Sequence, residues 1–186
     1  MSGGTRLLYL GQINRFKGLP LLLEAMSLLP AEVTLDVAGH GPLRDECEQI
    51  ARSRGLESRV RFHGWLGRDE VAALLREALT VVVPSTWNEP FGLVGLDAMA
   101  AARPVIAFDV GGVSEWLDAS TTGLLVPEVS SVALASAINE LLRDPARAAA
   151  FGRAGHERVR ASFSRANHVD RLVALMDSAR AQACFA

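Results

Sequence analysis

The chain has 186 residues, a net charge of −2 and 49% hydrophobic residues, which suffices for one globular domain with a sizeable core. Near-neutral charge without a basic block argues against a nucleic-acid-binding protein. The longest apolar runs fall far short of the ~20 residues that cross a bilayer, and no basic-then-apolar leader opens the chain, so we expect a cytoplasmic protein. Its two cysteines, Cys47 and Cys184, are too few to indicate a disulfide framework or a metal cluster.

Apolar runs that are typical of buried strands alternate with helical patterns along most of the chain. We expect six strands, within residues 7–10, 33–39, 59–64, 80–85, 104–108 and 122–127. Helical spacing fills the segments between them and the tail from residue 131 onward, where Pro145 suits a first helical turn. This alternation predicts an α/β fold: a doubly wound, six-stranded parallel sheet of Rossmann-like type, with helices on both faces and a helical C-terminal tail.

The segment 84–112 is the most unusual part of the chain. Its helix, FGLVGLDAMAAA, carries a single ionisable side chain, Asp97, so we expect the helix to be buried all round and Asp97 to have a polar partner. The amides at the helix start, at Gly92, Leu93 and Val94, can bind an anion such as a phosphate. Glu89 lies in the preceding loop. Taken alone, it would be interpreted as a solvent-exposed residue that caps the helix. Because Asp97 lies on an otherwise apolar helix, we instead favour a site for a phosphorylated ligand.

The spacing of the two acids bears on their chemistry. If most of the interval between Glu89 and Asp97 is helical, it spans roughly 12 Å, which exceeds the ~5–9.5 Å between the catalytic carboxyl groups of glycoside hydrolases. We therefore expect the two acids to hold opposite ends of one extended ligand rather than to form an acid/base pair.

Ligands of open parallel sheets bind outside the carboxyl ends of the strands. In this chain those ends carry glycines, the two acids and a basic loop, Gly11–Lys17. We expect Lys17 to contact a diphosphate that is bound by the helix amides, although a solvated lysine would fit the sequence equally well. Arg15 has the same two interpretations, and we favour a solvent-exposed side chain. The four histidines lack metal-ligand spacing and are expected to be structural or exposed.

Other nucleotide-binding and hydrolytic classes fit the sequence poorly. The nearest candidate for a dinucleotide motif, Gly39–Arg44, places arginine at the third glycine position. The chain contains neither a G-x-x-x-x-G-K-[ST] loop nor a G-x-S-x-G elbow, which disfavours phosphate-loop hydrolases and esterases.

Five fragments, taken in order, resemble a known family. They read LYLGQINRFKGLPLLLEA, VAGHGPL, VRFHGWL, VVPSTWNEPFGLVGLDAMAAARPVIAFDVGGVSEWL and TGLLVP. This series, which covers nearly the whole chain, resembles the C-terminal, donor-binding domain of group 1 glycosyltransferases of the GT-B fold. The fold is then expected to be the C-terminal half of GT-B.

The resemblance implies roles for individual residues. The two acids of the family's motif fall on Glu89, which would contact the hydroxyls of the donor sugar, and on Asp97, which would hold the ribose. Glu89 and Lys17 would be catalytic. The expected donor-binding set is Gly11, Gln12, Lys17, Leu66 (near the base), Glu89, Phe91, Gly92, Leu93 and Asp97. The family is typically retaining and metal-independent, with basic side chains and helix amides stabilising the departing nucleoside diphosphate, so neither a metal nor another cofactor is expected.

The chain departs from the family pattern in three ways. Gln12 stands where the family usually has arginine, which removes one positive charge facing the diphosphate. Asp97 replaces glutamate and is one methylene shorter. The N-terminal, acceptor-binding domain is absent, so residues 5–163 would be the nucleotide-sugar-binding domain and residues 164–186 the helix that crosses to the missing partner. Any peripheral membrane contact would lie in that missing domain.

These features lead to one principal hypothesis and two alternatives. The principal hypothesis is the donor-binding domain of a retaining glycosyltransferase of hexosyltransferase type, which uses a nucleotide-diphosphate sugar and is inactive or weakly active alone. One alternative is a sugar-nucleotide-binding module without transfer activity, which Gln12 favours. The other is a sugar-nucleotide epimerase of related fold.

Overall fold

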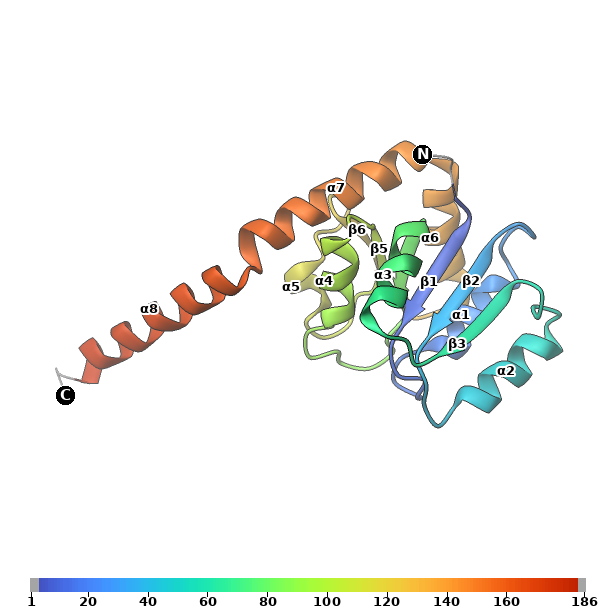
Figure 1. Ribbon diagram of the computed structural model, residues 1–186, viewed down its shortest axis with the longest axis horizontal. Coiled ribbons are helices and arrows are strands. Elements are labelled where there is room, and N and C mark those ends of the chain that lie inside the picture. The colour runs from blue at the N-terminus through green and yellow to red at the C-terminus, as the bar shows by residue number, and fades with distance from the viewer. Residues whose placement is uncertain (1–3, 184–186) are drawn as a thin grey trace.

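The computed structural model describes residues 4–183, which form a parallel sheet flanked by helices (Figure 1). The strands are β1 (Arg6–Leu10), β2 (Thr34–Ala38), β3 (Val60–Gly64), β4 (Thr80–Val83), β5 (Val105–Phe108) and β6 (Gly123–Val126). The helices are α1 (Leu19–Met26), α2 (Arg44–Ser53), α3 (Arg68–Glu77), α4 (Leu93–Ala100), α5 (Val113–Trp116), α6 (Ser131–Arg143), α7 (Pro145–Ser162) and α8 (Arg165–Ala183). Their kind and order agree with the sequence analysis. Cys184 lies outside the described residues.

The strand order is β3-β2-β1-β4-β5-β6, and all neighbouring strands are parallel. From β1, the chain adds β2 and β3 toward one edge of the sheet. It then returns to the centre, where β4 pairs with β1, and adds β5 and β6 toward the other edge. The predicted doubly wound, six-stranded sheet is therefore confirmed. The reversal between β1 and β4 is where ligands of such folds bind, since the loops that follow these two strands diverge to opposite sides of the sheet.

The two central strands are joined along only part of their length. β1 pairs with β4 through Leu7 and Leu8, opposite Thr80 and Val81, whereas β1 pairs with β2 along all five of its residues. Beyond Leu8 the two central strands separate toward their carboxyl ends. This separation opens the middle of the sheet at the edge where ligands are expected.

Each face of the sheet carries its own hydrophobic core, because successive side chains of a strand point to opposite faces. On β1, Leu7 and Tyr9 belong to the core beneath α1, α2 and α6, and Leu8 belongs to the core beneath α3, α4 and α5. Helix α7 contributes Phe151 to the first core and Val159 to the margin of the second. The central strands are thus covered on both faces, which explains their unbroken apolar sequences.

Helix α4 is not buried all round, contrary to the expectation. Only Gly95, Ala98 and Met99 are buried, while Leu93 is 69% exposed and Asp97 is also exposed. The buried face combines Met99 with the small residues Gly95 and Ala98, and a Cβ added at Gly95 would lie only 2.0 Å from the Trp116 ring. Val94 and Leu96 are partly buried against the same core, and Leu93 stays at the surface.

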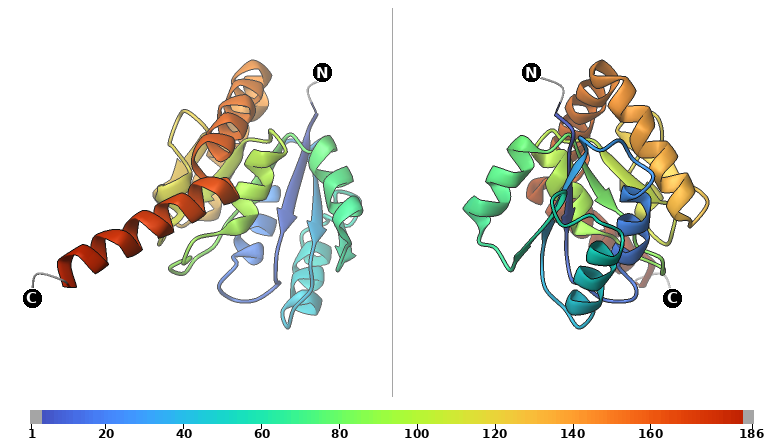
Figure 2. Two further views of the ribbon diagram at one scale, coloured as in Figure 1. Left: turned by 60° about the vertical axis from the view of Figure 1, so that its left-hand side comes forward. Right: turned by 90° about the vertical axis from the view of Figure 1, so that its right-hand side faces the viewer.

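The C-terminal helix α8 extends away from the sheet (Figures 1 and 2). Its larger apolar side chains, Val169, Leu172, Val173, Leu175 and Met176, are 47–67% exposed. No helix among residues 4–183 is both long enough and apolar enough to cross a membrane.

Candidate functional site

A pocket of about 420 Å³ lies at the carboxyl ends of β1 and β4, where these strands separate. It is lined by Tyr9, Leu10, Gly11, Gln12, Lys17, Val82, Val83, Pro84, Ser85, Glu89, Pro90, Phe91, Gly92, Leu93 and Val94. Most residues that the sequence assigned to the site therefore lie around one cavity. Leu66 and Asp97 are not among the lining residues.

The loops that follow β1 and β4 form opposite walls of the pocket and contact each other. The amide of Thr86 donates to the carbonyl of Phe16 (2.9 Å). Gly18 lies so close to the other loop that a Cβ there would fall 1.7 Å from the carbonyl oxygen of Pro84, and its φ of 65° is one that favours glycine. Asn14 fixes the turn in the first loop by accepting from the amides of Phe16 (3.0 Å) and Lys17 (3.2 Å) through Oδ1.

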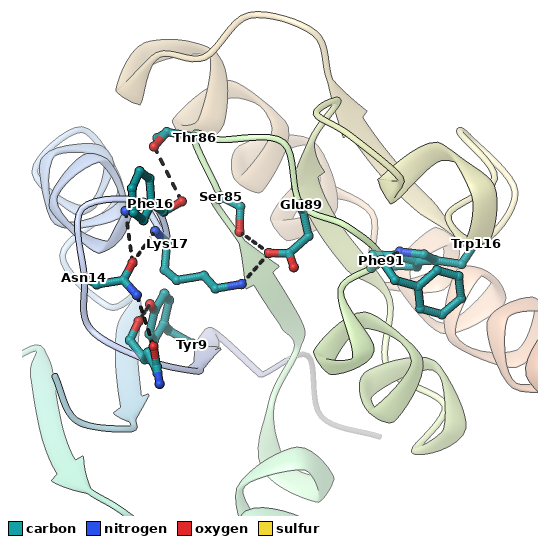
Figure 3. A network of polar contacts seen from close by, with 10 residues as sticks. Tyr9, Asn14, Phe16, Lys17, Ser85, Thr86, Glu89, Phe91 and Trp116 are labelled. Atoms are coloured by element: carbon teal, nitrogen blue, oxygen red, sulfur yellow. Dashed lines mark hydrogen bonds and ion pairs between the residues drawn. The ribbon is translucent and has the colours of Figure 1, made fainter.

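An ion pair between Lys17 and Glu89 crosses the pocket (Figure 3). Lys17 Nζ donates to Glu89 Oε2, which also accepts from the hydroxyl of Ser85 (3.0 Å). Glu89 is only 9% exposed, so these two donors compensate for the loss of water around its carboxylate. The paired ions provide a cationic donor and an anionic acceptor side by side.

The backbone that carries Glu89 is supported by the paired glycines after β5. The amide of Gly112 donates to the Glu89 carbonyl (2.8 Å). A Cβ at Gly111 would lie 2.4 Å from the same carbonyl oxygen, and Gly111 has a φ of 57°. Only glycine permits this approach without strain, so the GG pair holds the Glu89 loop close to the end of β5.

The amino end of α4 closes a further side of the pocket. Gly92 is the N-cap residue, with a φ of 84°, and the helix begins at Leu93. The indole nitrogen of Trp116 donates to the carbonyl of Phe91, which anchors the turn before the helix (Figure 3). The first amides of a helix lack intrahelical acceptors, so those of Leu93 and Val94 are suited to bind an anion in the pocket.

The inner end of the pocket holds a phenol next to the exposed Gln12. The Tyr9 hydroxyl donates to the backbone carbonyl of Gln12 (2.7 Å), and the side-chain oxygen of Gln12 accepts from Asn14 Nδ2 (3.2 Å). Burial raises the pKa of Tyr9 well above its ordinary value, and the nearby Cys47 and Glu89 act in the same direction. The phenol thus stays protonated and serves as a fixed hydrogen-bond donor.

Asp97 occupies a different position from the other predicted site residues. Within residues 4–183 its carboxylate forms no hydrogen bond or ion pair, so the expected polar partner is not in contact with it. Partial burial at the helix surface raises the pKa of Asp97, and the Arg68 guanidinium at the start of α3 opposes the rise. Because the helix begins only at Leu93, the interval from Glu89 to Asp97 is helical in its second half alone.

The sequence pattern does not single out Ser85, which binds Glu89, beyond its place at the end of a strand. The signal that could indicate it is a hydroxyl at the carboxyl end of a buried strand, where ligands of such sheets bind. Each histidine was expected to be structural or exposed, and two of them contact other residues: His63 Nε2 is 2.6 Å from Asp36 Oδ1, and His156 Nδ1 is 2.8 Å from the Ala100 carbonyl. No cluster of three or more potential metal ligands occurs in the described part of the chain.

The groups that line the pocket define the class of ligand that it can bind. Helix amides and a lysine suit phosphate oxygens, and the free oxygen of a buried carboxylate suits hydroxyl groups. A cavity of about 420 Å³ is large enough for a ligand that carries both.

Comparison with known proteins identifies the family. Residues 2–158 match the family model described as glycosyl transferases group 1. The protein therefore belongs to the group 1 glycosyltransferases, and the resemblance seen in the sequence is confirmed.

Relatives of this chain include proteins with different named activities. Alpha-D-kanosaminyltransferase from Streptomyces kanamyceticus is 34% identical over 141 residues, which is 74% of this chain and 36% of that protein. Sucrose-phosphate synthase from Thermosynechococcus elongatus has a TM-score of 0.85 and 37% identity, covering 95% of this chain and 46% of that one. Anabaena HepE, solved in complex with UDP and glucose, has a TM-score of 0.87 and 25% identity, covering 95% and 49%.

The chain spans half or less of each of these relatives. The structural neighbours are glycosyltransferases of the GT-B fold, and the chain corresponds to their C-terminal domain. The expected fold class, the C-terminal half of GT-B, is therefore confirmed.

Proposed function

We propose that this chain is the donor-binding domain of a retaining glycosyltransferase, which transfers a hexose from a nucleotide-diphosphate sugar to an acceptor held by a second, N-terminal domain. The observation that carries the proposal is the Lys17–Glu89 ion pair opposite the amino end of α4. Together these groups offer a cation and helix amides for a diphosphate, and a carboxylate for sugar hydroxyls. The presence of UDP in HepE supports a uridine nucleotide as the first ligand to test.

In the proposed reaction, the bond between the anomeric carbon and the phosphate oxygen breaks, and negative charge develops on the departing diphosphate. Lys17 and the amides of Gly92 and Leu93 would stabilise that charge, a role that other transferases give to a metal ion. Glu89 would orient the sugar through its hydroxyls while Ser85 holds the carboxylate in place. No cofactor is needed in this scheme.

A binding module without transfer activity is the second candidate, and Gln12 favours it. The Gln12 side chain is exposed, uncharged and bonded to Asn14, so the diphosphate side of the pocket has one cation, Lys17, among its lining residues. A module of this kind would bind nucleotide sugars but would not cleave them even when the second domain is present.

Titration calorimetry with UDP, GDP, ADP and their glucose conjugates tests the proposal directly. We expect one nucleotide series to bind the chain, with the sugar conjugate distinguishable from the bare diphosphate. Absence of binding by all of them at millimolar concentration would overturn the assignment of the donor site.

Transfer should require the second domain. Positioning of two reactants accounts for roughly 7–11 kcal/mol of a barrier, and this chain holds the donor alone. We propose that residues 5–163 bind the donor and that residues 164–186 dock on the N-terminal domain through the exposed apolar side chains of α8. Adding the N-terminal domain of the full-length protein in trans should then restore transfer, whereas turnover by this chain alone at ~1–10³ s⁻¹ would contradict the proposal.

A further inference from the structure

An aromatic pair connects the two loops that carry Lys17 and Glu89. The rings of Phe16 and Trp87 are 5.5 Å apart between centroids and inclined by 56°. The Arg15 guanidinium lies 4.6 Å from the centre of the Phe16 ring. We call these three side chains, which join the two loops, the aromatic clasp (Arg15, Phe16 and Trp87).

The clasp contributes little to the core of the domain. Trp87 is 63% exposed and Phe16 is 38% exposed, and neither belongs to the hydrophobic core on either face of the sheet. Burial of apolar surface in the domain interior therefore does not account for the contact. Phe16 lies on the loop between β1 and α1, and Trp87 lies on the loop between β4 and α4. The contact between their rings therefore constrains the distance between these two loops.

The two residues of the ion pair are close in sequence to the two rings of the clasp. Phe16 directly precedes Lys17, and Trp87 precedes Glu89 by two residues. A backbone hydrogen bond from Thr86 to Phe16 (2.9 Å) joins the same two loops. Displacement of either ring would therefore move the backbone segments that hold Lys17 and Glu89 relative to each other.

We propose that Phe16 and Trp87 are positioning residues for the donor site. Their contact keeps the two loops at the separation at which Lys17 meets a diphosphate while Glu89 meets the sugar on the same ligand. This inference rests on the proposed function, and it adds two residues that are not among those lining the pocket.

A binding experiment on the whole chain tests the inference. The probe is UDP-glucose, measured by titration calorimetry with Trp87→Ala, Trp87→Phe, Phe16→Leu and the double variant Phe16→Leu/Trp87→Ala. Val132→Ala is the control, because it truncates an equally exposed apolar side chain on α6 (68% exposed), away from the site. Hydrogen exchange of the Thr86 amide is measured without any ligand, because the hydrogen bond of this amide to Phe16 forms only when the two loops are in contact.

We expect Trp87→Ala to weaken UDP-glucose binding between about twofold and tenfold, the range that one aromatic contact supports. Trp87→Phe should restore most of the affinity, and the double variant should lose no more than the larger single loss, because either substitution breaks the same contact. The Thr86 amide should exchange faster in both single variants. Val132→Ala should match the wild type in all measurements.

Other outcomes decide against the inference. Wild-type affinity in Trp87→Ala, strictly additive losses in the double variant, or failure of Trp87→Phe to recover binding would each overturn it. If the wild-type chain binds no nucleotide sugar, the proposed function fails separately. In that case unchanged exchange at Thr86 in Trp87→Ala would also overturn the positioning role, and faster exchange would support only the closure of the two loops by the clasp.

Discussion

Lys17 and Glu89, 72 residues apart in the sequence, form an ion pair across the pocket, and the same carboxylate oxygen accepts a hydrogen bond from Ser85. One oxygen of Glu89 is thus committed to the protein, and the other is available to a ligand. Lys17 and Glu89 restrain each other in the unliganded protein. Removing either residue therefore changes both the contact with the ligand and the freedom of its partner.

Glu89→Ala should distinguish the sugar from the diphosphate. We expect weaker binding of UDP-glucose by roughly 1.5–3 kcal/mol, the value of a hydrogen bond to a charged group. UDP binding should be unchanged or stronger, because Lys17 loses its protein partner and is free to face the diphosphate. Calorimetry with the two ligands measures the difference, and equal losses for both would show that Glu89 does not face the sugar.

Asp97→Ala should weaken UDP and UDP-glucose alike, since both contain the ribose that this carboxylate is proposed to hold. The pKa of Asp97 is raised, so its charged form is lost at a higher pH than for an ordinary aspartate as the solution is acidified. Binding should therefore decline on acidification from a pH above the usual range of aspartate, and Asp97→Asn should abolish this part of the pH dependence. A loss confined to UDP-glucose would place Asp97 at the sugar instead.

Gln12→Arg should strengthen UDP binding. A guanidinium contacts a phosphate through two charged donors where the amide offers neutral ones, and we expect a gain of about 1 kcal/mol at this exposed position. The gain should shrink between 0.1 M and 1 M salt, as the Debye length falls from about 10 Å to 3 Å. Gln12→Met is the matched uncharged control. Unchanged affinity in Gln12→Arg would indicate that another cation, such as Arg15, already fills this place.

Gly95→Ala should destabilise the domain because the added methyl group would overlap the buried ring of Trp116. Overpacking of this kind costs about 1–3 kcal/mol, and each kcal/mol lowers the melting temperature of a chain of this size by about 2–4 °C. Gly67→Ala is the control, since its methyl group would meet only the flexible end of Glu70, at 3.4 Å. A melting temperature for Gly95→Ala that equals that of Gly67→Ala would contradict the packing described for α4.

Alkaline pH should destabilise the fold through Cys47. Burial raises the pKa of this thiol from 9.0 to about 11, so the folded state holds the proton more tightly than the unfolded state does. The contribution of the protonated thiol to the stability of the fold is complete below pH 9.0 and is lost as the pH rises to about 11. The free energy of unfolding should fall by roughly 2–3 kcal/mol over this range. Urea unfolding across this window should show a shallower fall in Cys47→Ala, and identical slopes in the two proteins would refute the prediction.

Much of the fold followed from the sequence because the strands are unbroken apolar runs and the breaks between them are marked by Gly and Pro. The same regularity located Lys17 and Glu89, since the carboxyl ends of parallel strands meet at one edge of the sheet. Local sequence did not reveal that the two charges pair with each other. Their contact depends on the close approach of Gly18 to Pro84, a tertiary feature.

Helix α4 shows where sequence patterns are insufficient. An apolar helix usually indicates burial on all sides, but α4 packs through Gly95 and Ala98 and leaves Leu93 and Asp97 exposed. Apolar composition does not distinguish a side chain buried within its own domain from one at the domain surface.

The separation of β1 from β4 beyond Leu8 has a consequence for how the site can change. The cavity exists because two strands diverge, and residues of both strands line it, so its presence depends on topology rather than on any one side chain. Substitutions at Gln12, Glu89 or Leu93 would alter what the cavity holds while leaving the cavity in place. Ligand preference and structural integrity are thereby separable, and substitutions among the lining residues can change specificity at little risk to folding.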